Sequence, residues 1–286
     1  MYSSAIKFSL IMATYGRKKE IEDFLDSILE QEKFDINELE IIIVDQNDVI
    51  ILDDLCEFYK DRLNLIHIKS DKKGLSLNRN IGLKIAKGQY VAFPDDDCKY
   101  YPDTLYRAIL LFKEHPKIDI FLGRIIDRDS NKNIIRNWKA RTFHINKKNF
   151  FFNYSSITIF ARKNSIKFDE KLGVGTFFGS YEDADYIWQA LNLKYKIQYV
   201  PDIDVWHPEP EEQELNYNKV YSYGLGFGAL IYKHMSISAV WLFIQSVGYH
   251  FINFLLNLIK LNKKGAKKSW LSLTSRFKGL YLYAIK

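Results

Sequence analysis

Cysteine is scarce in this chain, which has only Cys56 and Cys98 among its 286 residues. Two cysteines exclude a disulfide framework and are too few for a zinc site on their own. The N-terminal stretch MYSSAIKFSLIMATYGR has a short apolar run that ends in a basic turn, and it lacks a small-residue cleavage site. We therefore expect a protein that stays in the reducing cytoplasm.

Acidic residues are absent after Glu214, although ten Lys or Arg follow it. The whole chain has a net charge of +6, so residues 1–214 carry −4. A hydrophobic fraction of 47% and a charged fraction of 27% exclude a disordered chain. We expect one large domain at residues 1–214 and a basic tail at residues 215–286 that suits an anionic partner.

The tail contains the longest apolar stretch, residues 236–261, which has no charge before Lys260. Its length permits a membrane span, but four polar residues interrupt it and the basic segment NKKGAKKSW follows. Helices of mixed apolar and basic character are typical of segments that lie in a membrane interface. We favour this interpretation for residues 236–286, with Trp241 and Trp270 as anchors. The alternatives are a span, or an amphipathic tail that packs on the large domain or in an oligomer.

The rest of the chain alternates between strand-like and helix-like segments. The strands are predicted at residues 7–13, 39–46, 63–69, 89–97, 117–124, 150–163 and 197–207. Helices are predicted at about residues 21–29, 75–88, 102–112 and 180–196. Repeated strand–helix–strand units predict an α/β fold with a mostly parallel sheet covered by helices.

Polar residues follow four successive predicted strands, at the edge where ligands bind to such sheets. They are Thr14, Tyr15 and Arg17, then Asp45, then Asp71 to Gly74, and finally Asp95, Asp96 and Asp97. Three adjacent carboxylates repel one another unless a hard cation such as Mg²⁺ or Mn²⁺ binds them. The alternative is a solvated acidic turn that caps the next helix.

These motifs, in this order, resemble the GT-A-type family 2 glycosyltransferases, inverting enzymes that use nucleotide-diphospho-sugars. The resemblance covers residues 7 to about 210 and rests on FSLIMATYGR, IIIVDQ, KGLSLNRNIGLKIAKGQYVAFPDDD, GVGTFFGSYEDADYIWQAL and YVPDIDVWH. It implies a GT-A fold with a Rossmann-like central sheet. The nucleotide-sugar half would cover about residues 1–123 and the acceptor half about residues 124–214.

The resemblance implies a nucleotide site at the strand ends. Thr14 and Tyr15 match the turn that packs on the base, and Arg17 follows in the same loop. Asp45 matches the acid that hydrogen-bonds the base, typically uracil, although Asp is also a common turn former at a strand end.

The same resemblance assigns the segment GLSLNRN to the nucleotide. Gly74 would give a close approach, and Arg79 and Asn80 would reach the nucleotide. A guanidinium suits phosphate or pyrimidine edges because its donors lie in one plane. The alternative for Arg79 is an exposed helix face on which its stem packs.

The Asp triplet matches the Asp-x-Asp motif of the family. Alternation along an extended chain puts Asp95 and Asp97 on the same side. The resemblance implies that Asp95 lies near the ribose and the metal, that Asp97 binds the cation directly, and that Asp96 belongs to the nucleotide site. His207 would be a further metal ligand, its alternative being a structural histidine. The expected cofactor is Mn²⁺ or Mg²⁺, which would neutralise the leaving nucleoside diphosphate.

The pair Glu182 and Asp183 matches the Glu-Asp motif of the family, in which the Asp is the general base. An inverting transfer needs one base to take the proton of the acceptor hydroxyl. The alternative is a capping box made by Ser180 and Asp183, which would serve only the helix end.

We expect a non-processive glycosyltransferase, because the Gln-x-x-Arg-Trp signature of processive members does not follow Glu182 and Asp183. It would move one sugar from a nucleotide-diphospho-sugar to a hydroxyl of a glycan or lipid-linked saccharide. We expect the donor to be a UDP-sugar and the pathway to be bacterial surface polysaccharide assembly. We place it on the inner face of the cell membrane and expect no nucleic-acid partner. The alternatives are a sugar-nucleotide nucleotidyltransferase and an inactive, membrane-docked glycan-binding protein. The sugar, the acceptor and the oligomeric state stay open.

Overall fold

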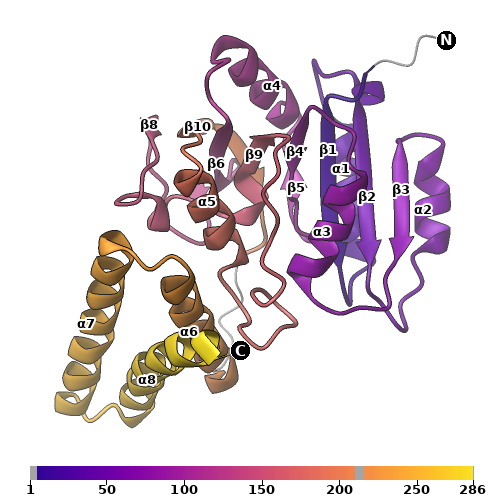
Figure 1. Cartoon of the computed structure of the whole chain (residues 1–286). Coiled ribbons are helices and arrows are strands. Elements are labelled where there is room, and N and C mark those ends of the chain that lie inside the picture. The colour runs from indigo at the N-terminus through magenta and orange to yellow at the C-terminus, as the bar shows by residue number, and fades with distance from the viewer. Residues whose placement is uncertain (1–4, 210–215, 286) are drawn as a thin grey trace. The chain divides into compact units, whose positions relative to one another are not determined.

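The computed structural model describes residues 5–209 and 216–285, and Figure 1 shows the course of the chain. The strands are β1 (Phe8–Thr14), β2 (Leu39–Asp45), β3 (Leu65–Lys69), β4 (Tyr90–Ala92), β5 (Lys99–Tyr100), β6 (Ile120–Asp127), β7 (Lys132–Asn133), β8 (Phe143–His144), β9 (Ile159–Arg162) and β10 (Ile197–Trp206). The helices are α1 (Lys19–Leu29), α2 (Asp53–Lys60), α3 (Leu75–Ile85), α4 (Thr104–Glu114), α5 (Glu182–Asn192), α6 (Tyr217–Lys233), α7 (Ile237–Ile259) and α8 (Lys263–Ile285).

The chain forms two compact units. The first combines residues 1–167 with 189–210, and the second combines residues 168–188 with 211–286. The sequence predicts a division near residue 214, whereas residues 168–188 group with the C-terminal helices because they share an apolar cluster with α6 and α8. The extent of the catalytic domain stays a prediction.

The first unit is built on one sheet with the strand order β3-β2-β1-β4-β9-β6-β10-β5. β1 pairs in parallel with β2 and β4, β2 with β3, and β6 with β10, whereas β9 runs antiparallel between β4 and β6. Six strands therefore run in one direction: β1, β2, β3, β4, β6 and β10. We call the edge at which these six end the carboxyl edge. The mostly parallel α/β sheet predicted from the sequence is confirmed.

Two central strands show why this sequence forms such a sheet. β1 (FSLIMAT) and β2 (LEIIIVD) are buried at every position, as parallel strands are when both faces are covered. Helix α3 packs on both of them. Gly82 of α3 allows the close approach, because a Cβ at this position would overlap the side chain of Ile11.

Two predicted strands are wrong for most of their length, since only residues 90–92 of the predicted strand 89–97 form a strand. Only residues 159–162 of the predicted strand 150–163 form a strand, and two 3₁₀ turns, Phe150–Phe152 and Ser156–Thr158, precede it. Side chains bond to the nearby backbone here, with Asn153 donating to the Asn149 carbonyl (2.6 Å) and Thr158 to the Ser155 carbonyl (3.0 Å). Such bonds offer the backbone an alternative to the sheet.

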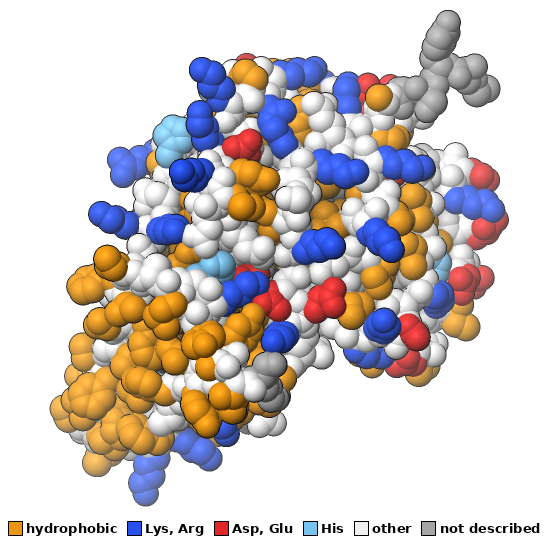
Figure 2. Space-filling model, in the orientation of Figure 1, with side chains coloured by type: hydrophobic (Ala, Val, Ile, Leu, Met, Phe, Trp, Pro, Cys, Tyr) orange, Lys and Arg blue, Asp and Glu red, His pale blue; other side chains and the backbone are white. Residues whose placement is uncertain are grey.

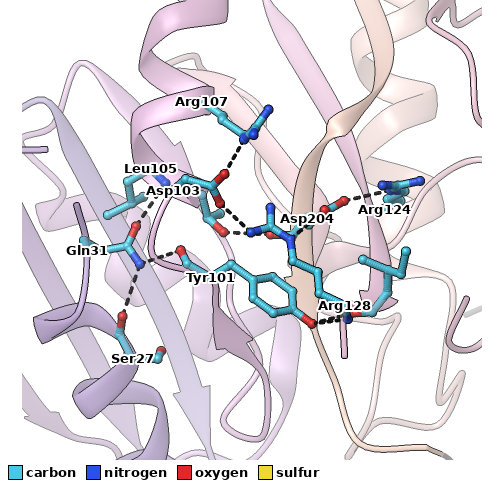
Figure 3. Close-up of polar contacts among 11 residues, drawn as sticks. Ser27, Gln31, Tyr101, Asp103, Leu105, Arg107, Arg124, Arg128 and Asp204 are labelled. Atoms are coloured by element: carbon cyan, nitrogen blue, oxygen red, sulfur yellow. Dashed lines mark hydrogen bonds and ion pairs between the residues drawn. The ribbon is translucent and has the colours of Figure 1, made fainter. Parts of the chain in front are cut away.

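A polar network ties β6 and β10 to α4 (Figure 3). Asp204 of β10 accepts hydrogen bonds from Arg124 Nε at 2.7 Å and from Arg128 Nε at 2.9 Å. Arg128 also donates to Asp103 at 2.8 Å, just before α4 begins. Thr104 donates to the backbone carbonyl of Asp204 at 2.7 Å. These bonds hold the end of β10, near the carboxyl edge, against β6 and the start of α4.

The second unit contains α6, α7 and α8, and the predicted C-terminal helical tail is confirmed. Helix α6 packs along α8 through small residues. A Cβ on Gly228 would overlap the backbone of Arg276 and Leu280, and a Cβ on Gly279 would overlap the backbone of Leu225. Helix α8 is therefore an integral part of this unit.

Helix α7 leaves most of its apolar side chains exposed, and Ala239 is its one buried residue. Figure 2 shows hydrophobic side chains gathered over this helix and its neighbour α8. By length and composition α7 could cross a membrane, with a mean hydropathy of 1.4 over its most apolar window, which alone is weak evidence for a span. Among the described residues, no other helix meets that criterion.

Candidate functional site

The turn after β1 is closed by Asp96. Thr14 Oγ1 donates to its carboxylate at 2.7 Å, the Tyr15 backbone N–H at 3.4 Å, and Arg17 Nη1 at 2.5 Å. Both carboxylate oxygens are engaged and the residue is buried. Asp96 thus holds the loop that carries Tyr15 and Arg17, and its place in the nucleotide site stays a prediction.

Asp97 shares Arg17 with Asp96 and also lies beside His207. Its Oδ1 lies 3.4 Å from Nε2 of His207, and its Oδ2 lies 2.7 Å from Nη1 of Arg17. Nδ1 of His207 lies 2.7 Å from the carbonyl oxygen of Pro208. A carbonyl only accepts, so Nδ1 carries the proton and the lone pair of a neutral imidazole is on Nε2, toward Asp97.

Asp95 is paired with Arg79 on α3. Nη2 of Arg79 lies 2.6 Å from Oδ1 of Asp95, and the guanidinium is buried. The exposed-helix alternative for Arg79 is therefore wrong. The pairing joins the first turn of α3 to the loop after β4, so two of the predicted strand-end segments meet at the carboxyl edge.

Two aspartates of the triplet, Asp95 and Asp96, have shifted pKa values. Burial raises the pKa of Asp95 above its ordinary value, Arg79 opposes the shift, and the charge of Asp97 adds to it. Burial also raises the pKa of Asp96, against the hydrogen bond from Thr14 and the charge of Arg17. Burial thus disfavours the charged form of both carboxylates, although Arg79 and Arg17 lie beside them.

Asp45 is buried at the end of β2 and has four donors. Asn47 donates its backbone N–H and its side-chain amide at 2.8 Å, Lys69 lies at 2.8 Å, and His67 at 3.0 Å. Burial opposes the charge of Asp45, but the bonds from Lys69, Asn47 and His67 outweigh it and lower the pKa. The bond to the Asn47 backbone is an Asx turn, the turn-forming role named as the alternative.

Gly74 begins α3 with φ of 127° and ψ of 123°, a conformation that side chains rarely permit. Its N–H donates to Gln46 Oε1 at 2.9 Å, and Asn78 donates to the same oxygen at 3.0 Å. Gln46 directly follows β2, so this bond joins the ends of β2 and β3. Sequence reasoning missed Gln46 and Asn78, because their role depends on contacts between residues about 30 positions apart. Asn80 lies half-buried on the same helix.

Tyr15 presents an exposed aromatic ring beside these residues. The ring is 59% exposed, and Nζ of Lys73 lies 4.7 Å from its centre. An exposed ring next to a cation at a strand end can stack on a planar base. This arrangement agrees with the predicted place of Tyr15.

No group of three or more His, Cys, Asp or Glu in residues 5–209 and 216–285 is arranged to hold a metal ion. The predicted set of Asp95, Asp97 and His207 is therefore not assembled as a group of three. Asp95 instead pairs with Arg79, and Asp97 with His207 forms the remaining pair. Their roles toward a metal stay predictions.

The second unit holds Glu182 and Asp183 in the first turn of α5. Asp183 Oδ1 accepts from the Ala184 backbone N–H at 2.8 Å, and Glu182 is buried. The Ser180 hydroxyl is buried and has no hydrogen-bond partner within the described part of the chain. The capping box of Ser180 and Asp183 is therefore not formed.

A buried ionic network anchors the same first turn of α5 through Asp185. Asp185 accepts from His234 Nε2 at 2.7 Å and from Lys233 Nζ at 2.9 Å, both at the end of α6. Lys233 also reaches Asp169 at 2.7 Å, and Tyr283 of α8 donates to Asp169 at 2.5 Å. The sequence analysis missed this network. It fixes the helix whose first turn carries Glu182 and Asp183.

The sheet order, the ligand-type residues at its carboxyl edge and the acidic pair on α5 define the class of the protein as a GT-A-type glycosyltransferase. The model of the family "Glycosyl transferase family 2" matches residues 9–184, more than half of the chain. The chain belongs to glycosyl transferase family 2, and the resemblance seen in the sequence is confirmed.

Two sequence relatives are named for a poly(ribitol-phosphate) transferase activity and for teichoic acid biosynthesis. The chain is 33% identical over 112 residues to the poly(ribitol-phosphate) β-N-acetylglucosaminyltransferase TarS of Staphylococcus aureus, which is 38% of this chain and 19% of that protein. It is 25% identical over 205 residues to the minor teichoic acid biosynthesis protein GgaB of Bacillus subtilis, 68% of this chain and 22% of that protein. The matches span about a fifth of the length of either relative.

Solved structures share the fold. TarS residues 1–349 in complex with UDP-GlcNAc match with a TM-score of 0.68 and 22% identity over 96% of this chain and 82% of that one. The mannosyltransferase PcManGT of Pyrobaculum calidifontis, in complex with GDP-Man and Mn²⁺, matches with a TM-score of 0.62 and 14% identity over 96% and 87% of the two chains. The GT-A fold predicted from the sequence is confirmed.

Proposed function

We propose that the protein is a non-processive, inverting glycosyltransferase that moves one sugar from a UDP-sugar to a hydroxyl of a glycan or lipid-linked saccharide. The observation that carries the proposal is the meeting of Asp97 with His207 and of Asp95 with Arg79 at the carboxyl edge of a family 2 chain. A likeness to TarS bound to UDP-GlcNAc supports a uridine nucleotide as the donor.

Tyr15 and Asp45 are the proposed base contacts, with Gly74, Arg79 and Asn80 along the rest of the nucleotide. The ring of Tyr15 is exposed for stacking. Asp45 already accepts from four donors, so a base would exchange with one of them, and Lys69 is the most exposed partner at 48%. Thr14 and Asp96 support the loop that carries Tyr15 through the hydrogen bond between them.

A divalent cation, Mn²⁺ or Mg²⁺, fits the donor set of Asp97 and His207. One hard carboxylate oxygen and one imidazole nitrogen lie 3.4 Å apart and leave the remaining ligand positions to the diphosphate. When bound, the cation supplies positive charge to the leaving nucleoside diphosphate. The positive charge of Arg17 also acts on Asp95, where it lowers the pKa of the carboxyl group against the larger effect of burial.

Asp183 is the proposed general base, with Glu182 beside it. The failed capping box supports this assignment, because Ser180 makes no cap bond to the helix start. A carboxylate in the first turn would take the proton of the acceptor hydroxyl as the oxygen attacks the anomeric carbon. The network of Asp185, His234 and Lys233 holds the helix in place.

We place the enzyme on the inner face of a bacterial membrane, peripherally bound through residues 236–286, in surface polysaccharide assembly. The exposed apolar side chains of α7 and the ten cations after Glu214 support this placement. Relatives that build cell-surface polymers support the pathway.

The test is incubation of the whole chain with a panel of nucleotide sugars, Mn²⁺ and saccharide acceptors, followed by detection of released nucleoside diphosphate. Acceptor-dependent release of UDP, with inversion at the anomeric carbon by NMR, is the expected result. Production of pyrophosphate would point to a nucleotidyltransferase. Glycan binding without any nucleotide release would point to an inactive binding protein.

A further inference from the structure

A strongly basic segment follows β6 in the first unit. Residues 128–148 contain seven Lys or Arg and a single acid, Asp129, a net charge of +6. The other residues up to 214 must therefore carry −10, because residues 1–214 as a whole carry −4. Figure 2 shows Lys and Arg side chains gathered around the place of β8 in Figure 1, within this segment. So sharp a local reversal of charge marks a surface for an anion.

The segment runs from the carboxyl edge to the opposite edge of the sheet. β7 pairs with Ile126 and Asp127 at the end of β6, whereas β8 pairs with Gln198 and Tyr199 at the start of β10. Gln198 and Tyr199 lie opposite Phe121 and Leu122 of the parallel strand β6, so the path between β7 and β8 runs along about five residues of β6, a rise of roughly 17 Å. The basic side chains thus lie along a line rather than at one point.

The cations of the two ends differ in their partners. At the carboxyl edge Lys132 pairs with Glu209, and Arg128 pairs with Asp103 and Asp204. Farther along, Lys139, Arg141, Lys147 and Lys148 make no ion pair with any acid that the structure describes. Three of these four are exposed and Lys147 is half-buried. Unpaired exposed cations are available to an outside anion.

A pocket lies at the carboxyl-edge end of the line. It has a volume of about 400 Å³ and is lined by residues 132–137 and Glu209. The Arg136 N–H bonds to the Ile134 carbonyl at 2.8 Å across Ile135, whose φ is 67°. A γ-turn of this left-handed kind is strained, above all at a β-branched residue.

The side chains of residues 128–148 favour binding of a phosphate polymer over binding of a membrane or a nucleic acid. Ile135 is its one large apolar side chain with high exposure among the described residues, so it lacks the anchors of a membrane-interface segment. Trp138 is buried, stacked on Tyr199 at 6.4 Å and covered by Arg136 at 5.1 Å, so it offers no ring to a base.

We propose that residues 128–148 form a track for the acceptor, and that the acceptor is an anionic polymer of sugar or polyol units joined by phosphodiesters. The proposal rests on the proposed glycosyl transfer and narrows its acceptor class. A repeating phosphodiester fits a line of cations that starts at the carboxyl edge, because one unit can enter the pocket while its neighbours bind along the track.

The test measures binding of a synthetic glycerol-phosphate oligomer to the full chain by calorimetry. The variant K139Q/R141Q/K147Q/K148Q removes four charges from side chains that no described acid pairs. We expect it to weaken binding by about 10- to 1,000-fold and to flatten the dependence on salt. The matched control, K84Q/K87Q/K113Q/K117Q, removes four exposed charges outside the segment and should bind as the parent does. Neutral dextran should bind none of the proteins through this surface.

Other outcomes overturn the proposal. These are a parent that binds UDP but not the oligomer, or a variant that binds the oligomer as tightly as the parent. A single-stranded oligonucleotide of equal charge that binds more tightly than the oligomer would assign the track to nucleic acid. Loss of binding to anionic vesicles in the same variant would assign it to lipid. UDP binding, measured on every preparation, separates these failures from failure of the proposed function, and oligomer binding without UDP binding would refute the acceptor role.

Discussion

Nε2 of His234 lies 2.7 Å from the carboxylate of Asp185, in a site where both side chains are almost completely buried. The imidazole of His234 also stacks on Trp188, which lies on α5 as Asp185 does, with the two rings 3° from parallel. Lys233 adds a second donor to Asp185. The C-terminal end of α6 is thus fastened to α5 at Asp185, in the turn that carries the proposed catalytic pair, and at Trp188.

The first prediction concerns this contact. Asp185→Asn should lower the free energy of unfolding by about 1–3 kcal/mol, because a buried charge-assisted bond is lost and its donors are left poorly matched. Asp202→Asn, an exposed acid on β10, is the matched control and should change little. Denaturant unfolding with an unchanged m-value measures both. Equal midpoints for parent and Asp185→Asn would show that the network contributes nothing to stability.

The second prediction separates two adjacent carboxylates. Asp97→Asn should fold normally but lose Mn²⁺-dependent UDP binding, because Asp97 is the proposed ligand beside His207. Asp96→Asn should instead lower the melting temperature, because Asp96 closes the turn through Thr14 and Arg17. Calorimetry with UDP, with and without Mn²⁺, and thermal unfolding are run on both variants. Mn²⁺-supported binding that survives Asp97→Asn would remove Asp97 from the metal site.

The Asp triplet shows how much of the site can be predicted from the sequence. Alternation predicted that Asp95 and Asp97 share a side, but β4 ends at Ala92 and the triplet lies in a turn, so that rule does not apply to it. The strand ends at which the site forms follow from local patterns. The partners do not: Asp185 meets residues of α6 that lie 48 and 49 positions later, and only the folded chain brings them together.

The third prediction concerns the exposed face of α7. Trp241, Ile244 and Ile252 are 61%, 54% and 58% exposed, and changing all three to Gln should reduce binding to anionic liposomes while sparing UDP binding. The matched control changes Val49, Ile51 and Phe58, exposed apolar residues of the first unit, to Gln. Vesicle sedimentation compares them. Unchanged sedimentation of the α7 variant would refute the membrane assignment.

The fourth prediction concerns the contact of α6 with α8. Gly228→Ala should destabilise the protein by about 1–3 kcal/mol, because the new methyl group would overlap the backbone of Arg276 and Leu280, which cannot turn aside as a side chain would. Gly248→Ala on α7 meets nothing within 4 Å and should be neutral or stabilising, by up to about 1 kcal/mol from helix propensity. Thermal unfolding of the pair decides. Equal changes in melting temperature for the two variants would show that the close contact between α6 and α8 does not contribute to stability.

The fifth prediction tests the base. Asp183→Asn should fold and bind UDP, yet lose transfer by about 100- to 10,000-fold, because an amide cannot take the proton of the acceptor hydroxyl. A carboxylate that served only the helix start would give the opposite result, a stability loss of about 1 kcal/mol or less with turnover retained. Ser180→Ala is the matched control, since the Ser180 hydroxyl bonds to no described group and its loss should spare turnover. Melting temperature, UDP affinity and turnover are measured on one preparation of each variant. Near-normal turnover in Asp183→Asn would move the search for the base to Glu182, because Asp185 is already held by His234 and Lys233.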